Sequence, residues 1–213
     1  MLKINQIRCE VGETFSIHHI AKKLHCSIHD IHSFEIDRES IDARGDDLHY
    51  SYSVYASIKN EDKYLKNRDV KKESKEVYIL PTTTMYPIQR PIIVGFGPSG
   101  MYAGLILAES GLNPIIIERG QAVEQRTKDI NEFFTKGKLL ESSNVQFGEG
   151  GAGTFSDGKL TTRMKNVRVS KVYEEFVEAG ANPAILYQQR PHLGTDVLQS
   201  IVKKIREKII RLG

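Results

Sequence analysis

The stretch that decides the fold is residues 91–120, PIIVGFGPSGMYAGLILAESGLNPIIIERG. A short apolar run at 91–94, which we expect to be a buried strand, leads into a GxGxxG pattern at 95–100, and a helical run follows. A second apolar run, 115–117, ends at Glu118, 18 positions after Gly100. This order of strand, glycine turn, helix, strand and acidic residue is typical of βαβ units that bind a dinucleotide. We therefore predict two strands joined by a helix that begins at Pro98, where the missing N–H of proline costs nothing.

The residues of this turn have distinct predicted roles. The first glycine, Gly95, allows the tight turn, and Gly97 lets backbone N–H groups approach a pyrophosphate. Gly100 lets the helix pack closely on the strand, and the start of the helix adds partial positive charge. Glu118 is expected to accept hydrogen bonds from ribose hydroxyls, which disfavours a 2′-phosphate, whereas Arg119 beside it would favour one. The turn alone does not distinguish NAD from FAD.

A second glycine-rich stretch, SSNVQFGEGGAGTFSDGK, covers residues 142–159. Neighbouring glycines allow a loop to present several backbone N–H groups to an anion or to lie flat against a planar ring. The alternative is a surface loop in which the glycines only make turns. A βαβ unit that binds adenosine needs a second segment for the far half of its cofactor, and this favours the binding role.

Four blocks of the sequence resemble the bacterial FAD-dependent dehydrogenase-like family, whose members are NAD(P)/FAD-dependent oxidoreductases: 95–120, VEQRTKDI at 123–130, 142–163 and RPHLGTD at 190–196. The resemblance covers nearly the whole chain, including the segment SIDAR at 40–44. It implies an α/β fold, with a partial Rossmann-type FAD-binding domain preceded by a small α+β, ferredoxin-like module. It also implies non-covalently bound FAD, with NAD(P)H as a candidate reductant.

The resemblance implies three groups of cofactor contacts and no catalytic acid or base. The pyrophosphate would lie against Gly95, Gly97, Pro98, Ser99 and Gly100. Glu118 and Arg119 would hold the adenosine ribose, and Arg126 would reach the phosphates. The pyrophosphate, the ribityl chain or the flavin ring would be approached by the second loop, through Gly150, Gly151, Gly153, Thr154, Ser156, Asp157 and Lys159.

We predict a small module at 1–80, a linker at 81–90 and an FAD-binding domain at 91–213. In the module, alternating residues at 48–58 predict a strand with 34–43 as its hairpin partner, and Ser16 would cap a helix beginning at Ile17. The charged run KNRDVKKESKE at 66–76 predicts a solvated helix or a linker, and 77–80 a further strand.

Three further helices are expected in the second half of the chain. The first, 121–136, would place Phe133 and Phe134 inward and end at Gly137. The next carries apolar residues between Val169 and Val177 and stops at Gly180. The last would be capped by Thr195 and has an apolar stripe at Leu198, Ile201, Val202, Ile205, Ile209 and Leu212.

Full-length members of the resembled family continue well beyond residue 213. The chain is therefore expected to be the N-terminal piece of a longer oxidoreductase and to be inactive alone. The apolar stripe of its last helix would then associate with a second copy, since a stripe of this kind needs a packing partner.

Composition excludes several classes of protein. Lys and Arg number 30 and Asp and Glu 27, so the net charge of +3 disfavours a DNA-coating protein. No apolar run approaches the ~18 residues of a membrane span, and residues 1–10 lack a secretory hydrophobic block. Two cysteines cannot make a disulfide framework. We predict a cytoplasmic protein without a membrane partner, acting on a small molecule that the sequence does not identify.

Two other candidate sites, a metal site and an RNA-binding surface, have weaker support in the sequence than the dinucleotide site. Histidines gather at positions 18, 19, 25, 29 and 32 near Cys26, but without the paired spacing of zinc ligands, and no metal is predicted. Tyr50, Tyr52 and Tyr55, with the lysine run at 66–75, would suit an RNA-binding sheet, although residues 1–90 carry no net charge. The alternatives to an FAD-dependent oxidoreductase are a nucleotide-sensing or RNA-binding accessory protein and an NAD-dependent dehydrogenase.

Overall fold

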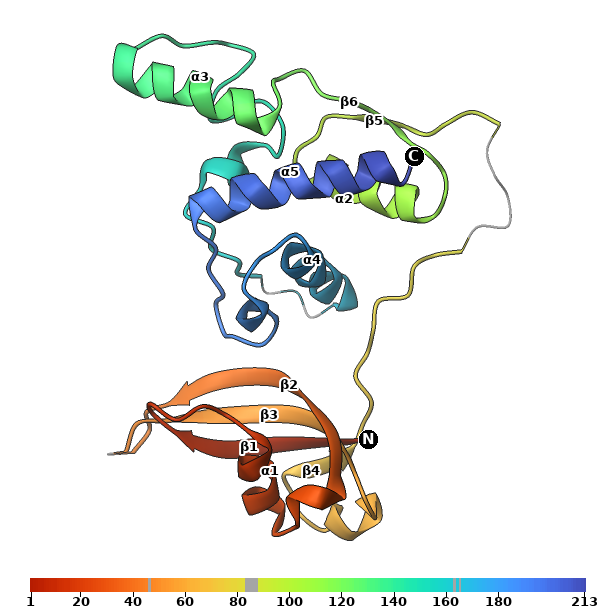
Figure 1. Cartoon of the computed structure of the whole chain (residues 1–213), viewed down its shortest axis with the longest axis vertical. Helices are drawn as coiled ribbons and strands as arrows, with labels where there is room; N and C mark the ends of the chain where they lie inside the picture. The colour runs from red at the N-terminus through yellow and green to blue at the C-terminus, as the bar shows by residue number, and fades with distance from the viewer. Residues whose placement is uncertain (46, 83–87, 163, 165) are drawn as a thin grey trace. The chain divides into compact units, whose positions relative to one another are not determined.

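The computed structural model describes residues 1–45, 47–82, 88–162, 164 and 166–213, and the chain divides into two compact units (Figure 1). Unit 1 consists of Met1–Val77 with Ala184–Gln189, and unit 2 of Tyr78–Pro183 with Arg190–Gly213. The predicted boundaries differ from this division because residues 184–189 lie with unit 1. Residues 83–87 of the predicted linker lie outside the described residues.

Unit 1 is built on a four-stranded antiparallel sheet in the order β2-β3-β1-β4. One α-helix follows β1, and a 3-10 turn, η2, stands between β3 and β4. Whether this arrangement belongs to the ferredoxin-like folds stays a prediction. The elements are β1 (Leu2–Glu10), α1 (Ile17–Leu24), η1 (Ile28–Asp30), β2 (Ile31–Asp42), β3 (His49–Ile58), η2 (Glu61–Tyr64) and β4 (Val70–Lys72).

The core of unit 1 follows the alternation of β3. Val54 and Ala56 are fully buried and pair with β1, where Leu2 and Ile4 are also fully buried. Ile20 of α1 joins the same cluster. Tyr52 belongs to this core as well, which argues against its use as a base-stacking surface.

Two local expectations for residues 1–80 are wrong, and one strand was missed. The charged run at 66–76 contains β4, because Val70 is buried and pairs with Ile4. Residues 77–80 form no strand. The missed strand is β1, although its residues alternate between apolar and polar in the sequence, and its burial follows this alternation.

Unit 2 contains a parallel pair of strands joined by a helix. β5 (Ile92–Val94) pairs with β6 (Ile115–Ile117), with Ile93 opposite Ile116, and α2 (Pro98–Glu109) connects them. The other elements are α3 (Val123–Lys136), η3 (Ala152–Phe155), α4 (Val167–Glu178), η4 (Pro183–Leu186) and α5 (Thr195–Arg211). The Rossmann-type name for this unit stays a prediction, since two parallel strands are described.

The two faces of this strand pair differ. A Cβ atom on Gly104 of α2 would overlap Ile116 and contact Ile93, so α2 packs closely on that face. The other face was expected to be buried, which is wrong: Ile92 is 64% exposed and Val94 84%. Parallel strands are usually covered on both faces, so this open apolar face is unusual.

The long helix α5 packs on α2 and η3 within unit 2. Its stripe is buried there, from Leu198 through Ile201, Val202 and Ile205 to Ile209. The expected exposure of these five residues is therefore wrong, because the chain itself covers them, whereas Leu212 at the end of the stripe is exposed. Self-association through this helix stays a prediction. The N-cap of α5 is Gly194 rather than Thr195.

In α3, Gly137 ends the helix in a left-handed conformation as predicted, with φ of +69°. The two phenylalanines of this helix do not point inward, since Phe133 is exposed and Phe134 is 72% exposed. None of the described helices combines the length and the apolar character needed to cross a membrane.

Candidate functional site at two glycine loops

The first loop is the turn between β5 and α2. The Gly95 N–H donates to the Ile117 carbonyl (2.7 Å), which closes the turn onto the neighbouring strand. The Met101 N–H donates to the Gly97 carbonyl (2.9 Å) and begins the helix, with Pro98 in its first turn. The turn therefore places the N-terminus of a 12-residue helix at the end of the strand pair.

The three motif glycines are present for different physical reasons. Gly95 has φ of +95°, a conformation that L side chains rarely adopt. A Cβ atom on Gly100 would overlap the Gly95 carbonyl oxygen. Gly97 is different, because its φ of −72° suits any residue and a Cβ atom would meet nothing within 4 Å. The fold needs glycine at 95 and 100 but not at 97.

Glu118 ties the end of β6 to this turn. Its Oε2 accepts a hydrogen bond from the Phe96 N–H (2.6 Å), and its Oε1 accepts one from the Gly120 N–H (2.8 Å). Each carboxylate oxygen can accept a second bond, so the group could still bind two hydroxyls. Glu118 lies beside a cavity of about 460 Å³ with mainly apolar walls, which include Ile116 and Ile209.

The second glycine loop packs directly on the first. The Gly150 N–H donates to the Phe96 carbonyl (2.7 Å). A Cβ atom on Gly151 would lie 3.2 Å from Pro98 Cδ and 3.4 Å from Gly97 Cα. The structure thus brings together two loops that are about fifty residues apart in the sequence.

Backbone N–H groups remain unpaired where the loops meet. Within the described residues, no hydrogen bond is donated by the amides of Gly97, Ser99, Gly100, Ala152 and Gly153. Gly153 also resembles Gly97, since a Cβ atom there would meet nothing within 4 Å. Unpaired amides beside open space form a site suited to an anion.

The other predicted residues of the second loop lie in different surroundings. Thr154 is buried, and its hydroxyl donates to the Glu149 carbonyl at 3.5 Å. The Ser156 hydroxyl donates to the Gly153 carbonyl (2.8 Å). Asp157 and Lys159 are exposed and form an ion pair with each other (2.7 Å), which lowers the pKa of Asp157. These side chains support the loop or face solvent, and the cavity beside Glu118 is lined by none of them.

The two predicted arginines differ from each other. The Arg119 guanidinium stacks over the Phe147 ring at 4.2 Å, beside a separate hollow that also includes Phe133. Arg126 is fully buried, and its guanidinium donates to carbonyl oxygens of the second loop. The bonds of Arg126 indicate support of the loop rather than the expected direct contact with phosphates.

Glu149 was missed by the sequence interpretation. It is buried, and its Oε2 accepts hydrogen bonds from the Val123 N–H (2.6 Å) and from Arg206 Nη1 (2.7 Å). Its Oε1 is buried and has no hydrogen-bond partner among the described residues, and burial raises the pKa of the carboxyl group. Glu149 therefore joins the second loop to the start of α3 and to α5. No sequence signal marks it beyond an acidic residue among glycines.

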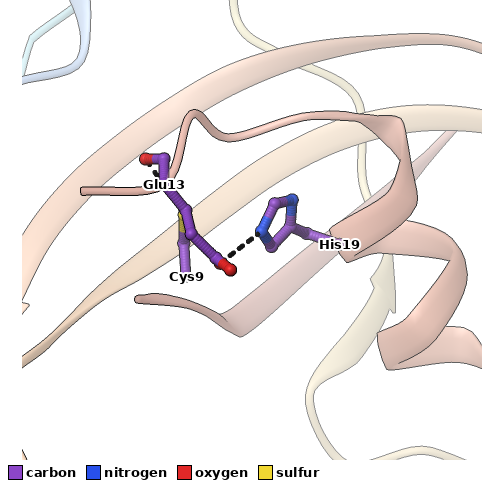
Figure 2. A group of neighbouring side chains, drawn as sticks. All are labelled: Cys9, Glu13 and His19. Atoms are coloured by element: carbon purple, nitrogen blue, oxygen red, sulfur yellow. Dashed lines mark hydrogen bonds and ion pairs between the residues drawn. The ribbon is translucent and has the colours of Figure 1, made fainter. Parts of the chain in front are cut away.

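A group of potential metal ligands lies in unit 1, where Cys9, Glu13 and His19 have ligand atoms within 4.8 Å of one another (Figure 2). The Ser16 N–H donates to His19 Nδ1 (3.2 Å), so Nε2 carries the proton and donates to Glu13 (3.3 Å). Burial raises the pKa of the Cys9 thiol, which disfavours the thiolate that a metal needs. The Cys9 thiol donates to the backbone carbonyl of Glu13 (3.7 Å), and the His19 and Glu13 side chains bond to each other. We assign no metal to this group.

Comparison with known proteins identifies a domain of unknown function, DUF8436, over residues 1–57. The chain is also 43% identical over 219 aligned positions to an "Uncharacterized protein" of Clostridium beijerinckii (strain ATCC 51743 / NCIMB 8052). The alignment covers the whole of this chain and 41% of the relative. The chain thus spans about two fifths of the length of the relative that it matches.

These findings correct the family expected from the sequence. The family model that matches is DUF8436, and the matched relative carries no oxidoreductase description. Membership of the FAD-dependent dehydrogenase-like family is therefore wrong as a prediction. Any function assigned to unit 2 must depend on the geometry of the two loops and not on that resemblance.

Proposed function

We propose that unit 2 binds FAD non-covalently where the two glycine loops meet, and that the protein is part of an oxidoreductase. The observation that supports this proposal is the presence of glycine at position 97, where the fold does not require it. Neither its backbone angles nor its neighbours require glycine, and the space beside it is open. A glycine that the fold does not need is explained if a ligand approaches the backbone there.

The surrounding groups match the parts of a dinucleotide. The unpaired amides of Gly97, Ser99 and Gly100, at the start of α2, suit a diphosphate because they donate hydrogen bonds to anionic oxygens. The Glu118 carboxylate suits the ribose hydroxyls of the adenosine half. The second loop would then contact the diphosphate or the flavin half, through the amides of Ala152 and Gly153.

Bound flavin would supply the hydride or electron transfer, with a nicotinamide nucleotide as a candidate reductant. The chain's own residues would bind and orient the cofactor, and the structure gives no reason to name a catalytic acid or base. The substrate stays unassigned.

The test is binding to the purified 213-residue chain. The visible spectrum would reveal bound flavin, and calorimetric titrations would compare FAD, ADP, riboflavin and NAD⁺. We expect FAD and ADP to compete for one site and riboflavin, which lacks the diphosphate, to bind far more weakly. Binding of NAD⁺ in preference to FAD would favour a nicotinamide-dependent dehydrogenase. Failure of both FAD and ADP to bind would refute the proposal.

A further inference from the structure

We infer that Arg126 is a positioning residue that sets the orientation of the peptide groups in the second glycine loop, so that this loop offers its amides to the ligand's diphosphate. The inference deepens the proposed function and rests on it. It assigns the buried guanidinium an indirect part in binding.

The contacts of Arg126 are almost entirely with one short segment. Nε donates to the Asn144 carbonyl (2.8 Å), and Nη2 donates to the Val145 carbonyl (2.8 Å). Nη1 donates to two carbonyls, those of Glu149 (2.6 Å) and Gly151 (2.8 Å). Four of the five N–H bonds of a guanidinium are thus used on the backbone of residues 144–151.

Burying a cation costs free energy of desolvation, so its hydrogen bonds must offset that cost. Burial lowers the pKa of Arg126, and the carboxylates of Glu118 and Glu149 oppose this effect. The Phe155 ring lies 4.8 Å from the guanidinium carbon and covers it from one side. An apolar residue would fill this space at lower electrostatic cost but could not hold four carbonyl oxygens.

The geometry of the peptide bond explains how the hydrogen bonds from Arg126 to carbonyl oxygens set the direction of the neighbouring N–H groups. In a trans peptide, the C=O of one residue and the N–H of the next point in opposite directions. The Glu149 carbonyl points at Arg126, so the Gly150 N–H must point away, and it donates to the Phe96 carbonyl of the first loop. Arg126 therefore turns this peptide group toward the turn at 95–100.

The same reasoning applies to the next bonded peptide group. The Gly151 carbonyl points at Arg126, so the Ala152 N–H points away from the guanidinium. This amide has no hydrogen-bond partner within the described residues. Because Gly151 also packs on Gly97, the Ala152 amide is available close to the first loop. A phosphate oxygen beside Gly97 is the ligand group that suits it.

Glycine at 150 and 151 makes this arrangement possible. Both residues have positive φ, +78° and +66°, which allows the chain to reverse between bonded carbonyls. Lysine could not replace Arg126, because an ammonium group has three donors and no planar fork.

The experiment compares Arg126→Lys with Arg168→Lys, a matched control at an exposed arginine in the first turn of α4. Amide hydrogen exchange in the ligand-free chain reports on the loop, and calorimetric titration with ADP reports on binding. We expect Arg126→Lys to speed exchange at Gly150 and to raise the Kd for ADP by about tenfold or more. Arg168→Lys should change neither quantity.

Two results would overturn the inference. Unchanged exchange at Gly150 would show that Arg126 does not hold the loop, and faster exchange with an unchanged Kd would show that its orientation does not matter for binding. If the parent chain binds neither ADP nor FAD, the proposed function fails, and the ligand part of this inference fails with it. Faster exchange at Gly150 in Arg126→Lys would still show that Arg126 holds the loop, even if the parent chain binds no ligand.

A second variant guards against misfolding. Arg126→Ala leaves space for a small cation, and methylguanidinium can be added to replace the missing group. We expect the added cation to restore ADP affinity at least in part, whereas ammonium at the same concentration should not. Absence of any rescue in a folded Arg126→Ala chain would count against the positioning role.

Discussion

Replacing Gly97 by alanine separates the needs of the fold from the needs of the ligand. The new methyl group would meet no atom within 4 Å, and the φ of −72° is open to alanine. Alanine is a poorer N-cap than glycine, but it also lowers the entropy of the unfolded chain, by about 0.4–1 kcal/mol. These effects oppose each other, so we expect the free energy of unfolding to change by less than about 1 kcal/mol.

The effect of Gly97→Ala on binding should be much larger. The methyl group would occupy the space in which a phosphate oxygen approaches the backbone, and would displace the anion from at least one amide. A hydrogen bond to a charged group contributes about 1.5–3 kcal/mol. Its loss corresponds to a rise in Kd of about 10- to 150-fold. Calorimetric titration with FAD would measure this rise, and thermal unfolding would measure stability.

Gly100→Ala is the matched control in the same turn. Its methyl group would overlap the Gly95 carbonyl oxygen, so we expect it to lower stability by about 1–3 kcal/mol or more. The reasoning predicts opposite patterns for two alanine substitutions three residues apart. It would be refuted if Gly97→Ala bound FAD as tightly as the parent chain, or if it unfolded as readily as Gly100→Ala.

Three other predictions concern neighbouring groups. Glu118→Gln replaces one acceptor oxygen by an NH₂ group that would face a backbone N–H. We expect the free energy of FAD binding to weaken by about 1–3 kcal/mol in a titration. Unchanged affinity would make Glu118 a purely structural residue. A hydrogen bond from Arg206 lowers the pKa of Glu124 from 4.5 to about 2, so this carboxylate stabilises the fold above pH 4.5, and the contribution is lost as the pH falls toward 2. The stability difference between the parent chain and Glu124→Gln should thus be present at pH 6 and largely lost at pH 2 in denaturant unfolding, and a difference independent of pH would contradict this. Ile205→Ala should lower stability by about 2–5 kcal/mol without changing the mass measured by light scattering, because Ile205 is buried inside unit 2; a change of oligomeric state would show that α5 is an interface.

Local patterns predicted much of the fold. The alternation at 48–58 located β3, and the glycine pattern at 95–100 located the turn between β5 and α2. These features depend on residues close together in the chain, where periodicity and turn chemistry are informative. The prediction of a solvated helix or a linker at 66–76 was wrong because one buried residue, Val70, was enough to form a strand beside β1.

Such local patterns could not predict which elements, distant in the sequence, pack against each other. The apolar stripe of α5 indicated that something must cover it, but not that α2 lies there. Phe133 and Phe134 fit a helical apolar face by spacing and are nevertheless exposed. Hydrophobic spacing shows which residues could share a face and not which neighbour is present.

The candidate site was predictable in part. The motif glycines and Glu118 lie together as their spacing indicated. The contact between Gly151 and Gly97, the unpaired oxygen of Glu149 and the commitment of Arg126 to loop carbonyls all need coordinates. Backbone hydrogen bonding between distant loops leaves no periodic signal in the sequence, which is why the role expected for Arg126 changed.

The most direct test of the central claim is a map of amide chemical shifts in the ¹⁵N-labelled 213-residue chain during titration with FAD. The proposed site predicts saturable changes at Gly97, Ser99, Gly100, Ala152 and Gly153, since these unpaired amides would donate to the diphosphate. Unit 1 should be unaffected. Absence of any change at these amides at millimolar FAD, or changes confined to unit 1, would contradict the account.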